Sequence, residues 1–361
     1  MAPRAAFLSF RFGLTDGVSV VARTWMDAFE QFGFDVITVT GEQGAHRRVP
    51  GLGLPDRHGT VPELDVATIT AQLESALADV DLVVVENLLT IPMNLPASHA
   101  TAAVLAGRPA LLHHHDPPWH RERFEHVTEL PATDPAWRHV AVNRILRDEL
   151  AERQIAASII YNGFPTPQRL SAAERRHLRS DVRRSVGIGA EDLVVAHPVR
   201  AIERKNVPAA IALAESLGAT YWLLGPAEEG YGDELEKLLA DARCAVVHHE
   251  WTDTEGIYAA ADHVAFPSTW EGFGNPPIEA GLYRRTVSVG EYPVGAELRS
   301  FGFDWFSPTD VDGIAAALAS PESSAVVAML DRNERVASEH FSLGRMRNSL
   351  HGLLDEAGWL P

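Results

Sequence analysis

Short apolar runs of strand length alternate along the first half of the chain with longer stretches of helical periodicity, and each run ends in polar residues. Strands that are joined through helices lie parallel in one sheet, so this order predicts an α/β fold with helices on both faces. Ligands bind such sheets beyond the carboxyl ends of the strands, where the polar residues fall. We expect strands at residues 5–10, 34–40, 81–85, 110–114 and 139–142, and a first helix at 18–32.

A break in this pattern occurs at residues 159–167, where Asn162, Gly163 and two prolines are typical of a connector. The alternation then resumes, with strands expected at residues 193–199, 220–225, 245–248 and in a run that ends at Pro267. At 361 residues the chain is also longer than one hydrophobic core usually covers. Two domains of ordinary size are therefore predicted.

Composition narrows the class of protein. Hydrophobic residues make up 46% and charged residues 22%, and no apolar run is long enough to span a bilayer, so we expect a cytoplasmic protein with no integral membrane segment. The single cysteine, Cys244, excludes an intrachain disulfide and fits a reducing compartment. The formal net charge of −18 argues against nucleic acid as a partner.

The most informative segment is residues 269–280, which places two carboxylates around a glycine-containing turn. Gly272 and Gly274 allow backbone amides to come close to a ligand. A helix is predicted to begin near Pro276, with Asn275 as its cap, and its N-terminal N–H groups favour an anion such as phosphate. Taken alone, Glu271 and Glu279 also fit a solvated loop residue and a charge that favours the helix start.

Two cations, Arg200 and Lys205, follow the strand that ends at Val199. Cations at the carboxyl end of a strand can neutralise a pyrophosphate as it departs with growing negative charge. The alternative is that both are ordinary surface residues of a loop.

Glu271 and Glu279 are separated by seven residues and flank a Gly-Phe-Gly turn, and here the chain resembles a large family of retaining glycosyltransferases, the family four-like bacterial mannosyl- and glucosyltransferases. The resemblance implies the GT-B architecture, in which two Rossmann-like domains face each other across a cleft. It places the crossing at Asn162-Gly163 and returns a C-terminal helix to the first domain. The implied bounds are 1–163 for the acceptor-side domain, 164–340 for the nucleotide-sugar domain and 341–361 for the returning helix.

The resemblance also implies roles for the residues of the second domain. Arg200 and Lys205 match the Arg and Lys that bind the donor diphosphate, together with the backbone of Phe273, Gly274 and Asn275. Glu271 would position the transferred sugar, and Glu279 would bind the ribose. In the first domain, Gly17 matches the family's glycine loop between the first strand and helix, within residues 14–19, and would admit donor or acceptor.

Three consecutive histidines, His113 to His115, end a predicted strand. Neighbouring side chains of a strand point to opposite faces, so the three cannot all bind one metal ion. The family has a histidine, often followed by aspartate, that contacts the transferred sugar at this strand end, and His115-Asp116 is the best match. His114 remains an alternative if the strand end is shifted, and a histidine that merely packs there is another.

Glu86-Asn87 ends another strand and, with Asp116, is a candidate for the acceptor side. A capped turn is the structural alternative there. No Asp-x-Asp pair follows a strand, since residues 79–81 precede one and residues 310–312 precede a helical pattern. No metal and no other cofactor is therefore predicted.

These expectations describe a retaining enzyme that moves a hexose from a UDP- or GDP-sugar to a hydroxyl of a small-molecule or glycoside acceptor. Two hypotheses keep the fold but change the function: a nucleotide-sugar epimerase or hydrolase, and a noncatalytic nucleotide-sugar-binding subunit. A nicotinamide dehydrogenase is disfavoured because no Gly-x-Gly-x-x-Gly follows the first strand.

Overall fold

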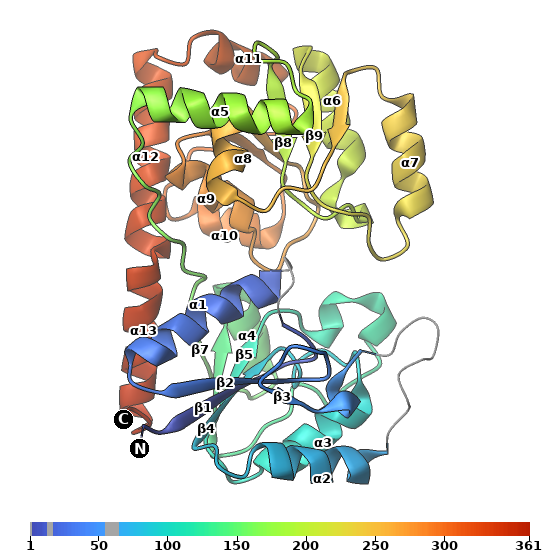
Figure 1. The fold of residues 1–361 in the computed structure, drawn as a ribbon, viewed down its shortest axis with the longest axis vertical. Helices are drawn as coiled ribbons and strands as arrows, with labels where there is room; N and C mark the ends of the chain where they lie inside the picture. Colours follow the sequence, from blue (N-terminus) through green and yellow to red (C-terminus); the bar gives the residue numbers. More distant parts are fainter. Residues whose placement is uncertain (1, 13–16, 55–64) are drawn as a thin grey trace. The chain divides into compact units, whose positions relative to one another are not determined.

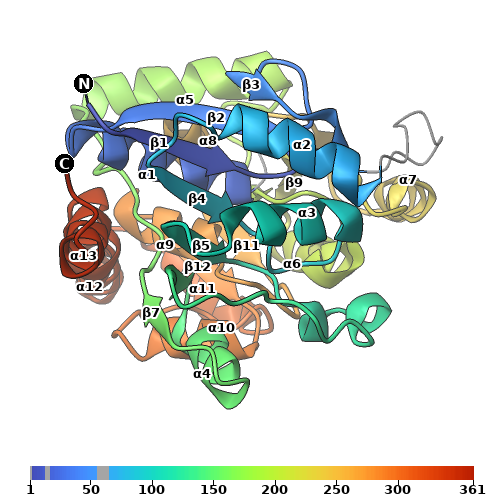
Figure 2. The ribbon, with the colours of Figure 1, turned by 90° about the horizontal axis from the view of Figure 1, so that it is seen from below.

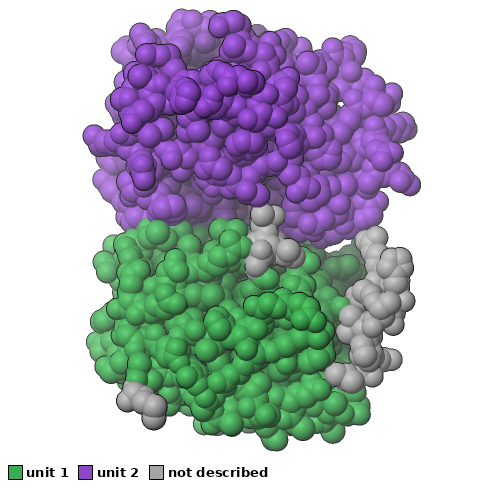
Figure 3. Space-filling view, in the orientation of Figure 1, with its two compact units in different colours: residues 1–163, 343–361 green, residues 164–342 purple. Residues whose placement is uncertain are grey.

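The computed structural model describes residues 2–12, 17–54 and 65–361, which form two compact units. Unit 1 comprises Met1–Gly163 and Leu343–Pro361, and unit 2 comprises Phe164–Ser342 (Figures 1 and 3). Unit 2 ends at Ser342 rather than at residue 340, because its last helix continues to Phe341.

Unit 1 is built on a seven-stranded parallel sheet in the order β3-β2-β1-β4-β5-β6-β7 (Figure 1). Its strands are β1 (Arg4–Leu8), β2 (Asp35–Thr40), β3 (Arg47–Arg48), β4 (Leu82–Glu86), β5 (Ala110–His114), β6 (Trp137–Ala141) and β7 (Ala157–Ile159). Its helices are α1 (Gly17–Gln31), α2 (Val66–Ala76), α3 (Leu95–Leu105), α4 (Arg144–Glu152) and α13 (Leu343–Glu356).

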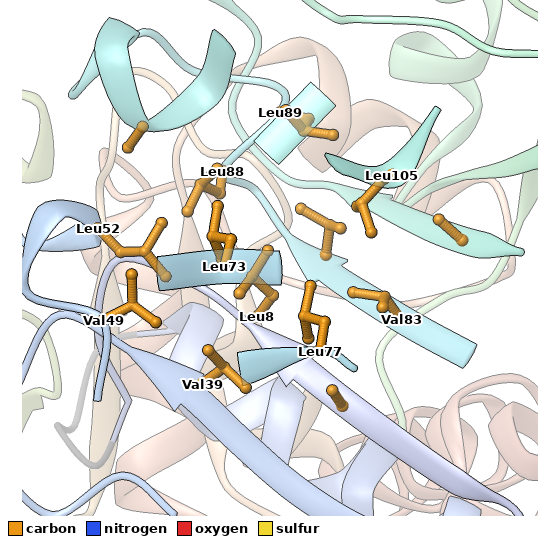
Figure 4. Close-up of a cluster of buried hydrophobic side chains, with 14 of the residues drawn as sticks. Leu8, Val39, Val49, Leu52, Leu73, Leu77, Val83, Leu88, Leu89 and Leu105 are labelled. Carbon is orange, nitrogen blue, oxygen red and sulfur yellow. The ribbon is translucent and has the colours of Figure 1, made fainter. Parts of the chain in front are cut away.

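Helices cover both faces of this sheet, because alternate side chains of each strand point to opposite sides. Ala6 and Leu8 of β1 belong to the core under α2 and α3, which lie side by side (Figures 2 and 4). Ala5 and Phe7 belong to the core on the other face, which α1 and α13 cover. The C-terminal helix therefore completes the unit that the N-terminal strand begins.

Unit 2 contains a five-stranded parallel sheet in the order β10-β9-β8-β11-β12. Its strands are β8 (Val194–His197), β9 (Thr220–Leu223), β10 (Val246–His248), β11 (His263–Phe266) and β12 (Thr286–Val289). Its helices are α5 (Ala172–Val186), α6 (Val207–Leu217), α7 (Gly232–Asp241), α8 (Thr254–Ala260), α9 (Asn275–Leu282), α10 (Pro293–Arg299), α11 (Val311–Ala319) and α12 (Ser324–Phe341).

Helix α5 shows how local sequence signals set an element of unit 2. Ser171 and Glu174 form a capping box at its start, and Gly187 ends it in the left-handed region with φ 78°. Near its end, the buried Arg183 donates to the backbone oxygen of Ala260 and to the Asp262 carboxylate. This arginine ties α5 to the end of α8 and the start of β11.

Within the described residues, no single helix is long and apolar enough to cross a membrane. Helices α11 and α12 meet that criterion of length and composition only as a pair, with a bend of 103° between them.

Candidate active site

The loop after β8 brings two cations to one carboxylate of unit 2. Lys205 lies at the end of a short 3-10 helix (Glu203–Lys205), and its Nζ donates to Glu271 Oε1 at 2.5 Å. Arg204 Nη1 donates to Glu271 Oε2 at 2.8 Å and to the backbone oxygen of Trp270 at 2.9 Å. Each carboxylate oxygen of Glu271 thus holds one cation, beyond the carboxyl ends of β8 and β11.

Burial and the neighbouring charges shift the pKa values of Lys205 and Glu271. Burial lowers the pKa of Lys205 to about 8, although the Glu271 carboxylate opposes that change, and the neighbouring Arg204 charge adds to it. Burial alone would raise the pKa of Glu271, but Lys205 and Arg204 outweigh it and the net direction is downward. Glu271 is therefore ionised at neutral pH and balances two cations in a site that is largely shielded from water.

Arg200, the other cation expected here, is held by a different carboxylate. Its Nη1 lies 2.5 Å from Glu228 Oε2, in the segment after β9. Sequence reasoning named neither Arg204 nor Glu228 as site residues. Arg204 could have been found because it directly precedes Lys205, whereas Glu228 approaches only through the pairing of β8 with β9.

The turn before α9 differs from the prediction in its cap. Gly274 occupies the cap position with φ 98°, and Asn275 is the first helical residue, so the expected Asn275 cap is wrong. A side chain at position 274 would be strained, and its Cβ would lie 2.8 Å from the Tyr292 hydroxyl. Phe273 is buried and packs edge-on against Phe341, so its side chain anchors the turn.

Glu279 lies in the second turn of α9 and is partly buried. Its Oε2 accepts a 2.7 Å hydrogen bond from the Tyr258 hydroxyl, and the Tyr258 ring stacks on Tyr283 with 5.0 Å between centroids. Burial raises the pKa of Glu279 above its usual value, and the tyrosine bond only partly offsets this. The hydrogen bond from Tyr258 fixes the orientation of the Glu279 carboxyl group.

In unit 1, Glu86 and two histidines form a buried cluster at the ends of β4 and β5. Glu86 pairs with His113 in the sheet register. His113 Nδ1 and His115 Nε2 lie 3.0 Å and 2.9 Å from the same oxygen, Glu86 Oε2. The Trp25 ring stacks on His113 with a centroid distance of 3.9 Å. Burial alone would raise the pKa of Glu86, but the two histidines lower it to about 2.

His114 points to the opposite face of β5, as alternation requires. Its Nδ1 lies 2.7 Å from Thr90 Oγ1 and its Nε2 lies 2.9 Å from His139 Nδ1, so the ring is fully buried in a separate network. Of the two histidines that the sequence left open, only His115 lies beside Glu86.

Asn87, the other residue expected on the acceptor side, has φ 62° and is buried. Its Oδ1 accepts from the backbone N–H groups of His115 and Asp116, each at 3.1 Å. The Asp116 carboxylate lies 3.5 Å from Arg121. Gly17 is the exposed first residue of α1, and residues 14–16 of the expected loop lie outside the described part of the chain.

Glu86, His113 and His115 are also close enough to be considered as metal ligands, since one donor atom from each lies within 4.8 Å of the others. Histidines that bind a metal usually donate their second N–H to a partner. His113 Nε2, however, is buried without a hydrogen-bond partner among the described residues. Both histidine nitrogens that face Glu86 lie at hydrogen-bond distance, so we interpret the cluster as a hydrogen-bonded one.

No family model matches this chain. It is 24% identical to mannosylglucosylglycerate synthase of Thermotoga maritima, over 96% of this chain and 98% of the relative. The Petrotoga mobilis protein of the same name is 23% identical, over 82% of this chain and 84% of the relative. Among solved structures, Anabaena Alr3699/HepE in complex with UDP-glucose is similar with a TM-score of 0.71 and 19% identity, over 98% of this chain and 99% of that one. The fold is thus shared over nearly the whole chain.

Proposed function

We propose that this chain, a nucleotide-sugar-dependent glycosyltransferase of the GT-B fold, moves a hexosyl group from a nucleoside diphosphate hexose to a hydroxyl acceptor and retains the anomeric configuration. One observation carries the proposal. Lys205 and Arg204 are held together by Glu271, directly before the Gly274 turn that opens α9. Two cations and a helix N-terminus in one place suit a diphosphate.

The diphosphate would be bound by exchange of partners. Its oxygens take up the N–H donors of Lys205 and Arg204 and the backbone N–H groups that begin α9, with Arg200 as a further cation. Glu271 is then released from one or both cations, and its oxygens accept hydrogen bonds from hydroxyls of the transferred sugar. Glu279, which Tyr258 holds in orientation, accepts hydrogen bonds from the ribose.

The reaction we propose is a displacement on one face of the sugar. The bond from the anomeric carbon to the phosphate oxygen breaks, and the acceptor oxygen forms the new bond on the same side. The acceptor proton passes to the departing phosphate. Lys205 and Arg204 stabilise the charge that grows on that phosphate, so they act more strongly in the transition state than in the ground state. His115 contacts the sugar near the reacting carbon.

Similar proteins support the classes of donor and acceptor. The Anabaena protein was crystallised with UDP-glucose, which supports a nucleoside diphosphate hexose as the donor. The Thermotoga and Petrotoga relatives are named as synthases of a glycosylated glycerate, which supports a small molecule or a glycoside as the acceptor. Gly17 and Asp116 are our candidates for residues that meet donor or acceptor in unit 1.

We further propose that transfer needs no metal ion. Glycosyl transfer requires positive charge at the leaving diphosphate, and Lys205 with Arg204 can supply it from side chains.

The test is a donor panel followed by a transfer assay. UDP-, GDP-, ADP- and TDP-hexoses are screened by thermal shift, because a ligand of the folded state raises its apparent stability. The selected donor is incubated in EDTA with glycerate, glucosylglycerate and simple glycosides, and the product linkage is determined by NMR. We expect a glycoside with the donor's anomeric configuration. Hydrolysis or epimerisation of the donor without any glycoside, or an inverted linkage, would contradict the proposal, and a requirement for a metal would contradict its metal-independent part.

A further inference from the structure

Glu86 is fully buried, yet only one of its two carboxylate oxygens has hydrogen-bond partners. Oε2 accepts hydrogen bonds from both His113 Nδ1 and His115 Nε2, while Oε1 has no partner among the described residues. The arrangement follows from the sheet, because Glu86 pairs with His113 in register and residues 113 and 115 share a face. The two imidazoles lie against each other with 4.2 Å between ring centroids.

The hydrogen-bond chemistry of this cluster decides where the protons lie. An ionised carboxylate can only accept hydrogen bonds, so each nitrogen that faces Oε2 must carry a hydrogen. Burial opposes ionisation, but the two histidines lower the pKa of Glu86 to about 2, and the group is a carboxylate at neutral pH. A neutral imidazole has one N–H. With a single ring hydrogen, His115 must carry it on Nε2, facing Glu86, and then has its lone pair on Nδ1.

Asn87 fixes the backbone of the same histidine. Its Oδ1 accepts from the N–H groups of His115 and Asp116 at 3.1 Å, and its own N–H donates to the His113 carbonyl at 3.0 Å. Asn87 reaches these groups from a left-handed conformation, which asparagine adopts more readily than most residues. The side chain and the backbone of His115 are thus held from one dipeptide at the end of β4.

We propose that Glu86 and Asn87 are positioning residues for His115. Glu86 locks the imidazole in its Nε2–H tautomer and presents the Nδ1 lone pair as a fixed acceptor for a sugar hydroxyl, and Asn87 holds the backbone from which the ring projects. The inference rests on the proposed contact between His115 and the transferred sugar. It replaces the expectation that Glu86 and Asn87 meet the acceptor, because both side chains are buried.

A double-mutant cycle tests whether Glu86 acts through His115. The Glu86→Gln variant keeps the size of the side chain but has one acceptor oxygen and no charge. We expect transfer to fall by roughly 10- to 100-fold, as for a misplaced catalytic group. In a His115→Ala background the same change should cost nothing further. Affinity for the free nucleoside diphosphate should be unchanged, because that ligand lacks the sugar. Equal losses in both backgrounds would overturn the inference.

The tautomer is tested independently of turnover. In ¹⁵N-histidine-labelled protein, the His115 signals are assigned by their loss in His115→Ala, and two-bond ¹H–¹⁵N spectra then show which nitrogen is protonated. We expect the Nε2–H form in the wild type and its loss or averaging in Glu86→Gln. An Nδ1–H form in the wild type would overturn the inference. If the wild-type protein transfers no sugar, the proposed function fails while this result still decides the tautomer.

Two further variants separate positioning from folding. Asn87→Asp keeps an acceptor oxygen at this position, whereas Asn87→Gly keeps the backbone freedom but removes the acceptor. We expect the aspartate variant to retain more transfer than the glycine variant. Thr90→Val breaks the hydrogen bond to His114 on the other face of β5 and is the matched control. Thr90→Val should lower stability, but its effect on transfer should be the same with and without the His115→Ala change. A coupling to His115 as strong as that of Glu86 would overturn the inference.

Discussion

Lys205 combines burial with a charge that donor binding would need. The side chain lies 2.5 Å from Glu271 and has Arg204 as its chain neighbour, and burial lowers its pKa to about 8. The depressed pKa means that the folded protein loses this positive charge as pH rises through about 8. An anionic diphosphate binds the protonated lysine, so binding above that pH must be accompanied by uptake of a proton.

This linkage predicts that affinity for the selected nucleoside diphosphate is full near pH 7 and falls above pH 8, by up to about tenfold per pH unit. Isothermal titration calorimetry between pH 7 and 9.5 measures it, and proton uptake is detected from the dependence of the heat on buffer. The control is Lys205→Arg, in which the guanidinium stays charged throughout and the fall should disappear. The same pH dependence in both proteins would exclude Lys205 as its source.

At the scale of single residues, the sequence indicates which side chains could take part in the chemistry, but it does not show which side chains they contact. Lys205 and Glu271 were each predicted as site residues, yet their direct ion pair joins segments that are far apart in the chain. Glu86 was expected on the acceptor side, because it ends a strand of the first domain and ligands bind such sheets beyond the carboxyl ends of the strands. Its burial depends on the register of β4 against β5 and on the Trp25 ring that covers His113, and neither is encoded locally.

Among the elements, the turn into α9 depends most directly on one residue. Gly274 has φ 98°, and a Cβ there would approach the Tyr292 hydroxyl to 2.8 Å. We predict that Gly274→Ala costs about 1–3 kcal/mol of stability and weakens nucleoside diphosphate binding, because the backbone amides that begin α9 are displaced. Urea unfolding measures the stability and calorimetry measures the affinity.

Two further variants identify the cause of this loss of stability. Tyr292→Phe in the Gly274→Ala background removes the close hydroxyl but leaves the strained φ, so it should restore part of the lost stability. Gly352→Ala, in α13, is the matched control, since its Cβ would meet open space and alanine favours a helix. A Gly274→Ala protein as stable as the control variant would mean that the turn tolerates a side chain.

The sequence predicts which strands and helices are present better than it predicts the residues at which they begin and end. The apolar runs gave β1, β2, β4, β5 and β6 within a few residues, because buried parallel strands are nearly continuous in hydrophobic residues. Residue preference predicts Asn275 as the cap of α9, whereas the structure places the cap one residue earlier, at Gly274. Close approach of β12's following loop, through Tyr292, favours glycine there, and such tertiary contacts are absent from a local pattern.

For the whole molecule, the two units differ in how the chain builds them. Unit 2 is one continuous segment, Phe164–Ser342, with its own sheet and helices, whereas unit 1 needs the C-terminal residues Leu343–Pro361 as well. Met346, Leu350 and Leu354 of α13 are buried in the core formed with β1 and α1. Unit 1 is therefore incomplete until the last residues of the chain are present.

Truncation after Ser342 should destabilise unit 1 selectively. The three buried side chains of α13 each contribute about 2 kcal/mol, so the loss is about 6 kcal/mol, comparable with the stability of a whole domain. The fragment 164–342, in contrast, should fold and bind the selected nucleoside diphosphate with nearly the affinity of the full chain, because Arg204, Lys205, Glu271 and the Gly274 turn all lie within it.

Hydrogen exchange of the truncated chain should show lost protection in β1 and β4 and retained protection in β8 and β11. Uniform loss across both units would mean that they unfold as one cooperative body, and a fragment that folds without binding would remove the diphosphate site from unit 2.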